Sequence, residues 1–245
     1  MRTHHEIYLQ LVDMVSTNNI VVDQPLKEYT YTRLGGKADF FVTPETYEQV
    51  QQIIQFANRE QIPFTLLGNG SNLIIRDGGI RGIVMNLAKL NGMYVTGTKL
   101  VAQAGAEIIH VSRKALKHEL TGLEFACGIP GSVGGALYMN AGAYGGEIKD
   151  VLETTVVAHR DGNIITLQAE ELDLSYRTSN IPDHGYIVLE ATFQLAEGNY
   201  DDIKAVMDDL TYKRESKQPL EYPSCGSVFK RPPGYYAGKL IQDSG

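Results

Sequence analysis

Glycine is concentrated in residues 122–146, and its spacing there favours contact between the backbone and a large ligand. The glycines of this segment stand at positions 122, 128, 131, 134, 135, 142, 145 and 146. Without a Cβ, a residue lets a ligand approach the main chain closely and adopts conformations that other residues avoid. A flexible linker is the alternative, but Leu123, Phe125 and Ile129 are too apolar for a solvated linker. We therefore predict that this segment binds a flat or anionic ligand through its backbone.

A second polar turn, residues 68–72, joins two predicted strands. Consecutive N–H groups in such a turn can form a concave oxyanion site, and Ser71 and Asn72 add side-chain donors. An ordinary turn stays open as an alternative, because Asn-Gly is a common turn pair. A Walker A loop is excluded because no Gly-Lys-Ser/Thr follows, and no Gly-x-Gly-x-x-Gly opens a helix after a strand as a Rossmann site requires.

Composition and charge are those of an ordinary soluble protein. The chain has 245 residues, of which 43% are hydrophobic and 21% charged, and its net charge of −7 gives no electrostatic footprint for nucleic acid or an anionic membrane. No apolar run approaches the ~20 residues of a membrane-spanning helix, and the N-terminus lacks the apolar core of a signal peptide. The histidines lack metal-ligand spacing, and we expect Cys127 and Cys225 to be reduced. We therefore expect a cytoplasmic protein without metal, membrane or nucleic-acid partners. We also expect a monomer, although composition does not determine the oligomeric state.

The elements fall into two regions and a C-terminal remainder. Ile7 and Leu11 mark an amphipathic helix, and Thr43 with Pro44 is typical of the start of another. Strands are predicted over 38–42, 64–67, 73–75, 82–87, 93–104, 151–158, 164–167 and 186–195, and helices over 108–116 and, after a cap at Asn199, over 203–210. Asp161-Gly162 supplies a hairpin turn, and residues 218–223 are predicted as a linker. The predicted domains are 1–88, 89–217 and 218–245.

Taken together, the two glycine turns resemble the FAD site of the vanillyl-alcohol-oxidase fold. Residues 68–73 resemble its pyrophosphate loop, and residues 128–135 resemble the strand and turn that face the isoalloxazine ring. Within that superfamily the chain closely resembles the UDP-N-acetylenolpyruvoylglucosamine reductase (MurB) family. Three further ordered motifs carry this resemblance, at residues 32–36 (TRLGG), 174–178 (LSYRT) and 226–232 (GSVFKRP), so that it covers nearly the whole chain.

The resemblance implies an α+β fold, with a two-part FAD-binding module and a C-terminal α+β substrate domain. It implies non-covalent FAD, NADPH as the reductant and a UDP-sugar substrate, UDP-N-acetylglucosamine enolpyruvate, which is reduced to UDP-N-acetylmuramate in peptidoglycan synthesis. The FAD-binding residues implied are Gly68, Asn69, Gly70, Ser71, Asn72, Gly128, Ile129, Gly131, Ser132, Gly134, Gly135, Asn140, Ala141 and Gly142. The substrate-binding residues implied are Tyr176, Arg177, Lys230 and Arg231.

Two of the motifs carry the catalytic residues that the resemblance implies. Arg177 matches the arginine that binds the substrate carboxylate, and a planar guanidinium stabilises charge as it grows there. Ser227 matches the serine that protonates the carbanion-like centre, where position matters more than pKa. The alternatives are a surface salt bridge for Arg177, a turn serine for Ser227 and a solvated basic pair for Lys230 and Arg231. No histidine partner for Cys225 is evident, so we expect it to have a structural role or to line the site.

The family pattern also has a catalytic glutamate that follows the motif at residues 238–245. No residue here matches that glutamate, so we expect the third domain to be incomplete. The segment with a substrate-capping tyrosine is also missing, as in the shorter subtype of the family. Two other functions stay open: an oxidase of small alcohols in the same FAD superfamily, and a flavin- or nucleotide-binding fragment without catalysis.

Overall fold

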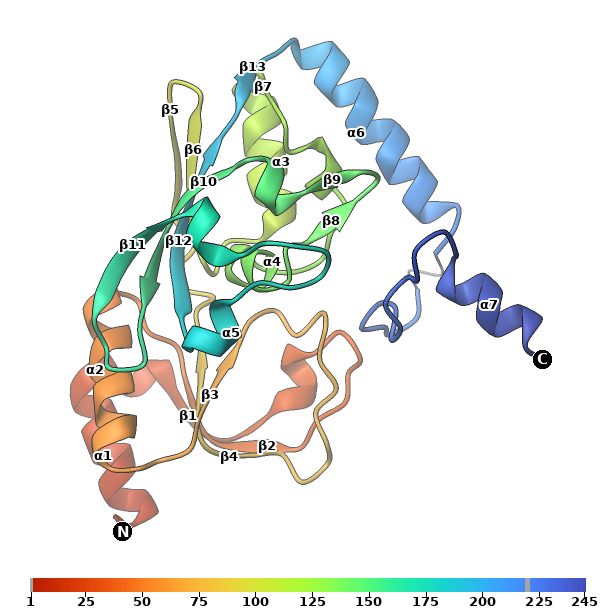
Figure 1. Cartoon of the computed structure of the whole chain (residues 1–245). Coiled ribbons are helices and arrows are strands. Elements are labelled where there is room, and N and C mark those ends of the chain that lie inside the picture. The colour runs from red at the N-terminus through yellow and green to blue at the C-terminus, as the bar shows by residue number, and fades with distance from the viewer. Residues whose placement is uncertain (1, 219–220) are drawn as a thin grey trace.

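A computed structural model of the chain describes residues 2–218 and 221–245, and Figure 1 shows the course of the chain through them. The helices are α1 His4–Val15, α2 Tyr47–Arg59, α3 Ile108–Lys117, α4 Val133–Tyr138, α5 Ile181–His184, α6 Tyr200–Glu215 and α7 Ala237–Asp243. The strands are β1 Ile20–Pro25, β2 Lys37–Val42, β3 Phe64–Leu67, β4 Ile80–Asn86, β5 Met93–Thr96, β6 Lys99–Gln103, β7 Leu120–Thr121, β8 Gly142–Ala143, β9 Gly146–Glu147, β10 Leu152–Ala158, β11 Ile164–Gln168, β12 Ile187–Gln194 and β13 Ala196–Glu197. Short 3₁₀ turns lie at Thr17–Asn19, Leu26–Tyr29, Glu124–Ala126, Ile148–Asp150 and Ala169–Leu172.

The first sheet is mixed and has the strand order β1-β2-β4-β3. β1 is antiparallel to β2, whereas β2 and β3 are both parallel to β4. Because parallel neighbours cannot be joined by a tight turn, residues 68–79 return from the end of β3 to the start of β4. The turn at 68–72 therefore lies at the carboxyl end of a parallel strand, the edge at which open α/β sheets bind ligands.

Helix α1 forms where the apolar spacing predicts it. Thr3 and Glu6 make a capping box, in which Glu6 N donates to Thr3 Oγ1 (3.3 Å) and Thr3 N donates to Glu6 Oε2 (2.7 Å). The buried face of the helix is Ile7, Leu11 and Val15, so this prediction is confirmed.

The predicted start of α2 at Thr43 is wrong. Thr43 N donates to Asn19 O (2.9 Å), and this bond keeps Thr43 beside the residues that lead into β1. The cap is Thr46, whose Oγ1 accepts from Gln49 N (3.2 Å). Both threonines have the hydroxyl that a cap requires, and the contact with Asn19 decides which of them caps the helix.

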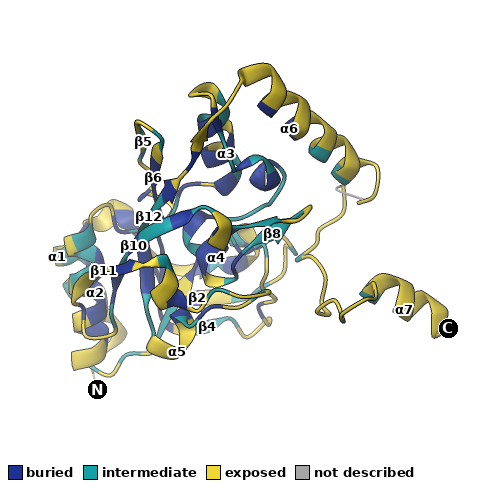
Figure 2. Ribbon diagram, turned by 45° about the horizontal axis from the view of Figure 1, so that its top comes forward, coloured by how far each residue is buried: buried dark blue, intermediate teal, exposed yellow. Residues whose placement is uncertain are grey.

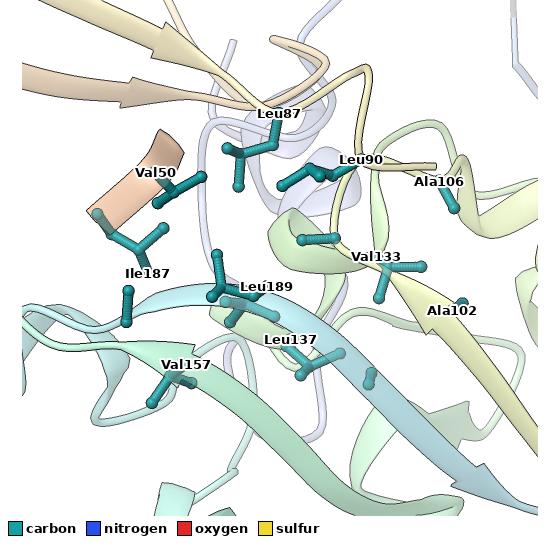
Figure 3. Packing of buried hydrophobic residues seen from close by; sticks show 14 of the residues in the cluster. Val50, Leu87, Leu90, Ala102, Ala106, Val133, Leu137, Val157, Ile187 and Leu189 are labelled. Atoms are coloured by element: carbon teal, nitrogen blue, oxygen red, sulfur yellow. The ribbon is translucent and has the colours of Figure 1, made fainter. Parts of the chain in front are cut away.

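The second sheet is antiparallel, with the order β11-β10-β12-β6-β5, and α3 and α4 pack beside it. The predicted strands of this region and the cap at Asn199, whose Oδ1 accepts from Asp201 N and Asp202 N, are confirmed. Figure 3 shows Leu137 and Val133 of α4 beside Leu189 of β12, with Val50 of α2 in the same cluster. One core therefore joins the two sheets, and the boundary at residue 88 stays a prediction.

Two local predictions in the glycine-rich parts of the chain are wrong. Residues 73–75 form no strand: Leu73 and Ile74 are exposed, and Ile75 alone is buried, beside Leu67. Of the strand and turn expected over 128–135, the turn is present at 128–132, whereas α4 stands where the strand was expected. The Ser132 side chain caps that helix by accepting from Gly135 N (3.3 Å), which sequence periodicity does not reveal in so short a helix.

Residues 221–245 lie apart from the two sheets. None of them is buried, and Figure 2 shows α7 as exposed beyond its first residue, Ala237, which is intermediate. Every hydrogen bond and ion pair that these residues make within the described chain stays inside the segment itself. The predicted linker over 218–223 includes residues 219–220, which lie outside the described residues.

Two properties bear on function class. Among the described residues, no helix combines the length and the apolar character that crossing a membrane requires. In the same part of the chain, no three His, Cys, Asp or Glu side chains are grouped as metal ligands would be.

Candidate active site

The turn at 68–72 is shaped by Gly70. Its φ is +64°, and an added Cβ would lie 2.1 Å from Tyr29 O. Gly70 O accepts from Tyr31 N (3.1 Å), so the turn is held against residues 29–31. Only glycine fits this position, because both the conformation and the close approach to Tyr29 exclude a side chain. The buried Asn86 supports the turn from below, since its Nδ2 donates to Leu67 O (2.9 Å) and Gly68 O (3.2 Å).

The turn at 68–72 meets the glycine-rich turn at 128–132. Ser71 Oγ donates to Pro130 O (3.0 Å), and a Cβ on Gly131, whose φ is +138°, would lie 3.2 Å from the same Oγ. A Cβ on Gly68 would lie 3.1 Å from Ser132 Oγ. The structure therefore brings together two of the predicted segments, which are about 60 residues apart in the chain.

The second turn is fixed to the connection between β6 and α3. Ile108 N donates to Gly131 O (3.0 Å), Val133 N to Ala106 O (2.8 Å) and Gly134 N to Ala104 O (2.9 Å). The position of this turn thus depends on a β-like pairing across the chain rather than on its own sequence.

The two turns present backbone donors that have no partner. Within the described chain, no hydrogen bond is donated by the N–H groups of residues 69–72, 131 and 132. Gly70 and Ser132 are buried residues, and an N–H left without a partner inside a protein is costly. Consecutive free N–H groups at such turns bind oxyanions. The site therefore fits a group with phosphate oxygens, as the pyrophosphate of FAD has.

Two adjoining cavities of about 320 and 370 Å³ open beside this junction, each within the size range of ligand pockets. Both are lined by Asn69, Ala88 and Glu107. The other lining residues are Glu28, Tyr29, Thr30, Tyr31, Gly68 and Asn86 in the first cavity, and Asn91, Met93, Gly105, Ala106 and His110 in the second. Apart from Gly68 and Asn69, these residues were missed by sequence reasoning, because they come from separate loops that show no motif.

Neither cavity is lined by a lysine or an arginine. Glu28 and Glu107 are acidic, so phosphate oxygens bound there would have to accept hydrogen bonds from backbone N–H groups and neutral side chains. Burial raises the pKa of the Tyr29 and Tyr31 hydroxyls, which stay protonated as donors at neutral pH.

The remaining predicted residues of the glycine-rich segment lie around the same turn. Gly128 lies under Arg214 of α6, whose Cδ would be 2.9 Å from an added Cβ. Ile129 is partly buried against the main core. Gly134 packs on Ala104, and Gly135 lies in the first turn of α4.

Arg177 lies at the tip of a tight turn in which Ser175 and Thr178 exchange backbone hydrogen bonds of 3.1 and 3.2 Å. Its φ is +56°, an uncommon value for a residue with a side chain and one found at functional sites. Nη2 donates to Gly142 O (2.7 Å), and Cζ lies 5.5 Å from the centre of the exposed Tyr176 ring. Within the described chain, Arg177 has no acidic partner, so its charge and most of its donors are free for a ligand.

Residues 140–142 connect the two parts of the site. They follow α4, which begins directly after Ser132, and Gly142 O accepts the hydrogen bond from Arg177 Nη2. Ala141 N donates to Ala136 O (2.8 Å). The Asn140 side chain bonds to Glu147 Oε2, Ser175 O and Lys149 N, and the prediction that it binds FAD stays untested.

Ser227, Lys230 and Arg231 are not brought to Arg177 by any contact in the described chain. Ser227 Oγ donates to Phe229 O (3.0 Å) within its own exposed segment. Arg231 Nε donates to Tyr235 O (2.9 Å), and its Cζ lies 4.0 Å from the centre of the Tyr236 ring. Lys230 is exposed. The roles of these residues stay predictions.

Comparison with known proteins decides the family. Residues 38–168 match a family described as an FAD binding domain, and residues 218–245 match the C-terminal domain of UDP-N-acetylenolpyruvoylglucosamine reductase. A UDP-N-acetylenolpyruvoylglucosamine reductase of Oceanobacillus iheyensis is 69% identical over 244 residues, which cover 100% of this chain and 80% of that protein. This chain belongs to the UDP-N-acetylenolpyruvoylglucosamine reductase family. A reductase of the same name from Geobacillus kaustophilus is 61% identical over 245 residues, with 81% of its length covered.

Solved structures agree with this family assignment and with its fold. The UDP-N-acetylenolpyruvylglucosamine reductase of Thermus caldophilus has a TM-score of 0.79 and 35% identity, and the match covers 92% of this chain and 79% of that one. p-Cresol methylhydroxylase is similar in fold alone, with a TM-score of 0.58, 13% identity and coverage of 79% and 43%. The predicted fold class, with FAD as cofactor of the reductase family, is confirmed.

Proposed function

We propose that this chain reduces UDP-N-acetylglucosamine enolpyruvate to UDP-N-acetylmuramate, with NADPH as reductant and FAD as carrier, in peptidoglycan synthesis. Its similarity to reductases of that name supports the substrate. The observation that carries the proposal is that the described chain has unpartnered N–H groups at 69–72, 131 and 132 and, at Arg177, a guanidinium without an acidic partner. We also propose a cytoplasmic monomer, and the net charge of −7 argues against nucleic-acid and anionic membrane partners.

The two glycine turns would hold FAD. Their free N–H groups would bind its pyrophosphate oxygens. The hydroxyl groups of Ser71 and Ser132 lie beside these N–H groups, where the two turns meet. Bound FAD would supply the redox chemistry, which is the transfer of a hydride from NADPH to the double bond. The cavities beside Asn69 and Glu107 would enclose part of the cofactor and exclude water from it.

Arg177 would bind the carboxylate of the enolpyruvyl group, with Tyr176 next to it. Hydride adds to the terminal carbon of the double bond, so negative charge develops on the adjacent carbon and its carboxylate. A planar guanidinium makes a two-pronged contact with a carboxylate and stabilises that charge as it grows. The bond from Arg177 Nη2 to Gly142 O aims the group while leaving other N–H donors free.

Ser227 would protonate the adjacent carbon, and Lys230 and Arg231 would hold the nucleotide diphosphate. These roles rest on the match of residues 226–232 to the family motif and on the match of residues 218–245 to the family's C-terminal domain. They require that segment to approach Arg177, a contact that the described chain does not make.

We expect the purified protein to be yellow and to release FAD when it is precipitated with acid. Binding should be non-covalent, because the contacts at the junction are backbone N–H groups and hydroxyls. The absorbance spectrum of the protein and of the acid supernatant measures this. A colourless protein that cannot take up FAD would contradict the cofactor, and flavin that stays on the polypeptide would contradict only the non-covalent attachment.

The same sample, kept free of oxygen, distinguishes the proposed function from the alternatives. NADPH should bleach the flavin, and UDP-N-acetylglucosamine enolpyruvate should restore its colour. Oxygen consumption with a small alcohol and no NADPH would instead indicate the oxidase. A flavin that NADPH reduces and the enolpyruvyl sugar cannot reoxidise would indicate a flavin-binding protein without the second half-reaction.

Ser227→Ala should slow reoxidation by the enolpyruvyl sugar by about 10²–10⁴-fold, the usual contribution of a positioned proton donor. Reduction by NADPH should be nearly normal, because it involves no protonation of the sugar. Ser224→Ala is the matched control: it removes a hydroxyl of the same segment that only accepts from Gly226 N (3.1 Å). Stopped-flow absorbance of the flavin resolves both steps, and slow reduction with normal reoxidation would refute this role.

A further inference from the structure

The side-chain amide of Asn140 bonds to three groups from two segments, residues 147–149 and Ser175. Its Nδ2 donates to Glu147 Oε2 (2.6 Å) and to Ser175 O (3.0 Å), and its Oδ1 accepts from Lys149 N (2.9 Å). A side-chain amide has two N–H donors, so both are already in use. Asn140 is fully buried, with 0% of its surface exposed.

The backbone of Asn140 is also unusual. Its φ is +39°, a left-handed value that asparagine tolerates better than most residues with a side chain. Asn140 N donates to Leu137 O (3.1 Å) at the end of α4. The left-handed residue therefore ends the helix and directs its side chain between the neighbouring segments.

Charge orients the amide. Glu147 Oε1 pairs with Lys149 Nζ (2.6 Å), and Glu147 Oε2 accepts from Asn140 Nδ2. The hydrogen bond to Glu147 raises the pKa of Lys149, so this lysine stays charged. A carboxylate acceptor makes the Asn140 bond charge-assisted, and it requires the NH₂ group rather than the oxygen to face Glu147. The same NH₂ group then reaches Ser175 O.

Ser175 is the first residue of the turn that carries Arg177. That turn is tied to residues 140–142 at two points, through Asn140 Nδ2 to Ser175 O and through Arg177 Nη2 to Gly142 O. The first tie holds the base of the turn, and the second holds the guanidinium at its tip. Loss of the first would leave the turn with its own two backbone bonds, the Arg177 side chain and, one residue further on, the bond from Ser179 Oγ to Tyr138 O (2.7 Å).

We propose that Asn140 is a positioning residue for Arg177: it holds the 175–178 turn so that the guanidinium is ready for the substrate carboxylate. This inference rests on the role of Arg177 under the proposed function. It assigns the Asn140 side chain to the protein rather than to FAD. Asn140→Asp is the sharpest test, because it keeps the size of the side chain and replaces both N–H donors with an oxygen that faces Glu147 and Ser175 O.

Hydrogen exchange in the flavin-free protein tests the positioning without any activity. In Asn140→Asp, the amides in a peptide over residues 172–180 should exchange at least tenfold faster, because Ser175 N and Thr178 N lose the support of the turn. Asn140→Gly should act the same way, since glycine accepts the φ of +39° and only the amide is removed. Thr155→Val is the control for a lost buried hydrogen bond, the one from Thr155 Oγ1 to Glu190 O (2.7 Å), and should leave this peptide unchanged. Unchanged exchange over 172–180 in both Asn140 variants would overturn the proposal.

Stopped-flow reoxidation of the flavin by the enolpyruvyl sugar tests the coupling to Arg177. Asn140→Asp should lower the limiting rate at least tenfold, with a smaller effect on the half-saturating sugar concentration, while reduction by NADPH stays within about twofold. In an Arg177→Ala background, the same change should have no further effect, as expected for residues that act as a unit.

The outcomes separate this inference from the proposed function. A normal rate in Asn140→Asp beside a slow Arg177→Ala would overturn the inference and leave the role of Arg177 intact. An equal slowing by Asn140→Asp with and without Arg177 would show that Asn140 acts by another route, and would also overturn it. A normal rate in Arg177→Ala would refute the catalytic role of Arg177 and this inference with it.

Discussion

Arg177→Ala is expected to slow reoxidation of the reduced flavin by the enolpyruvyl sugar by about 10²–10³-fold, the loss typical of a donor that stabilises developing charge. Arg177 is free of acidic partners in the described chain, and its Nη2 bond to Gly142 O leaves further donors for the substrate carboxylate. Arg177→Lys should recover only part of the rate, because an ammonium keeps the charge and loses the planar fork. Reduction by NADPH should change little in either variant.

Stopped-flow absorbance without oxygen measures both half-reactions. Arg160→Ala is the matched control, because Arg160 Nη2 also donates to a backbone carbonyl, Pro182 O (3.4 Å), beside α5 and outside the Arg177 turn. It should leave both rates normal. Equal rates in Arg177→Ala and Arg160→Ala would show that the guanidinium of Arg177 only supports the turn.

Gly70→Ala is expected to destabilise the protein and to weaken FAD binding together. A left-handed φ alone costs a residue with a side chain roughly 1–2 kcal/mol, and here the new Cβ would also lie 2.1 Å from Tyr29 O, a backbone atom that cannot rotate away. In a protein of this size, 1 kcal/mol shifts the melting temperature by about 2–4 °C, so we expect a fall of about 5 °C or more. Movement of the turn would also displace the N–H groups of residues 69–72, which we propose bind the pyrophosphate oxygens of FAD.

Gly78→Ala is the control in the same loop between β3 and β4. A Cβ there meets no atom within 4 Å, and its φ lies outside the left-handed range. This change should leave the melting temperature equal or slightly higher, because alanine reduces the freedom of the unfolded chain. Thermal unfolding of the apo-protein and titration with FAD measure the two effects. If Gly70→Ala behaves like Gly78→Ala in both, the turn is not rigid and does not hold the cofactor.

Local sequence determined those features whose cause lies within a few residues. The spacing of Ile7 and Leu11 determined α1, and the side-chain oxygen of Asn199 determined the start of α6, because helix periodicity and capping act over three or four residues. The glycines at 70 and 131 likewise identified both turns, because a position that needs a residue without Cβ is occupied by glycine in the sequence. The ordered motifs predicted the family, and the comparisons confirmed it.

Predictions from local sequence were wrong where a contact with a distant residue, or its absence, decided the structure. Thr43 and Thr46 could each cap α2, and only the contact of Thr43 with Asn19 O excludes the first. The run at 73–75 is apolar enough for a strand, but a strand requires a partner, and this one has none in the described chain.

Tertiary structure alone decided which groups the site presents. The N–H groups of residues 69–72 are free because the loop that follows β3 has no partner strand there. The loop contacts the second turn through the bond from Ser71 Oγ to Pro130 O. Glu107 reaches the same cavities from the connection that holds that turn. Asn140 lies in the same segment as the glycines that were predicted to bind FAD, yet its amide is occupied by Glu147 and Ser175. Such pairings depend on contacts between residues far apart in the chain. The residue type alone does not show whether the fold leaves a hydrogen-bond donor free or gives it a partner.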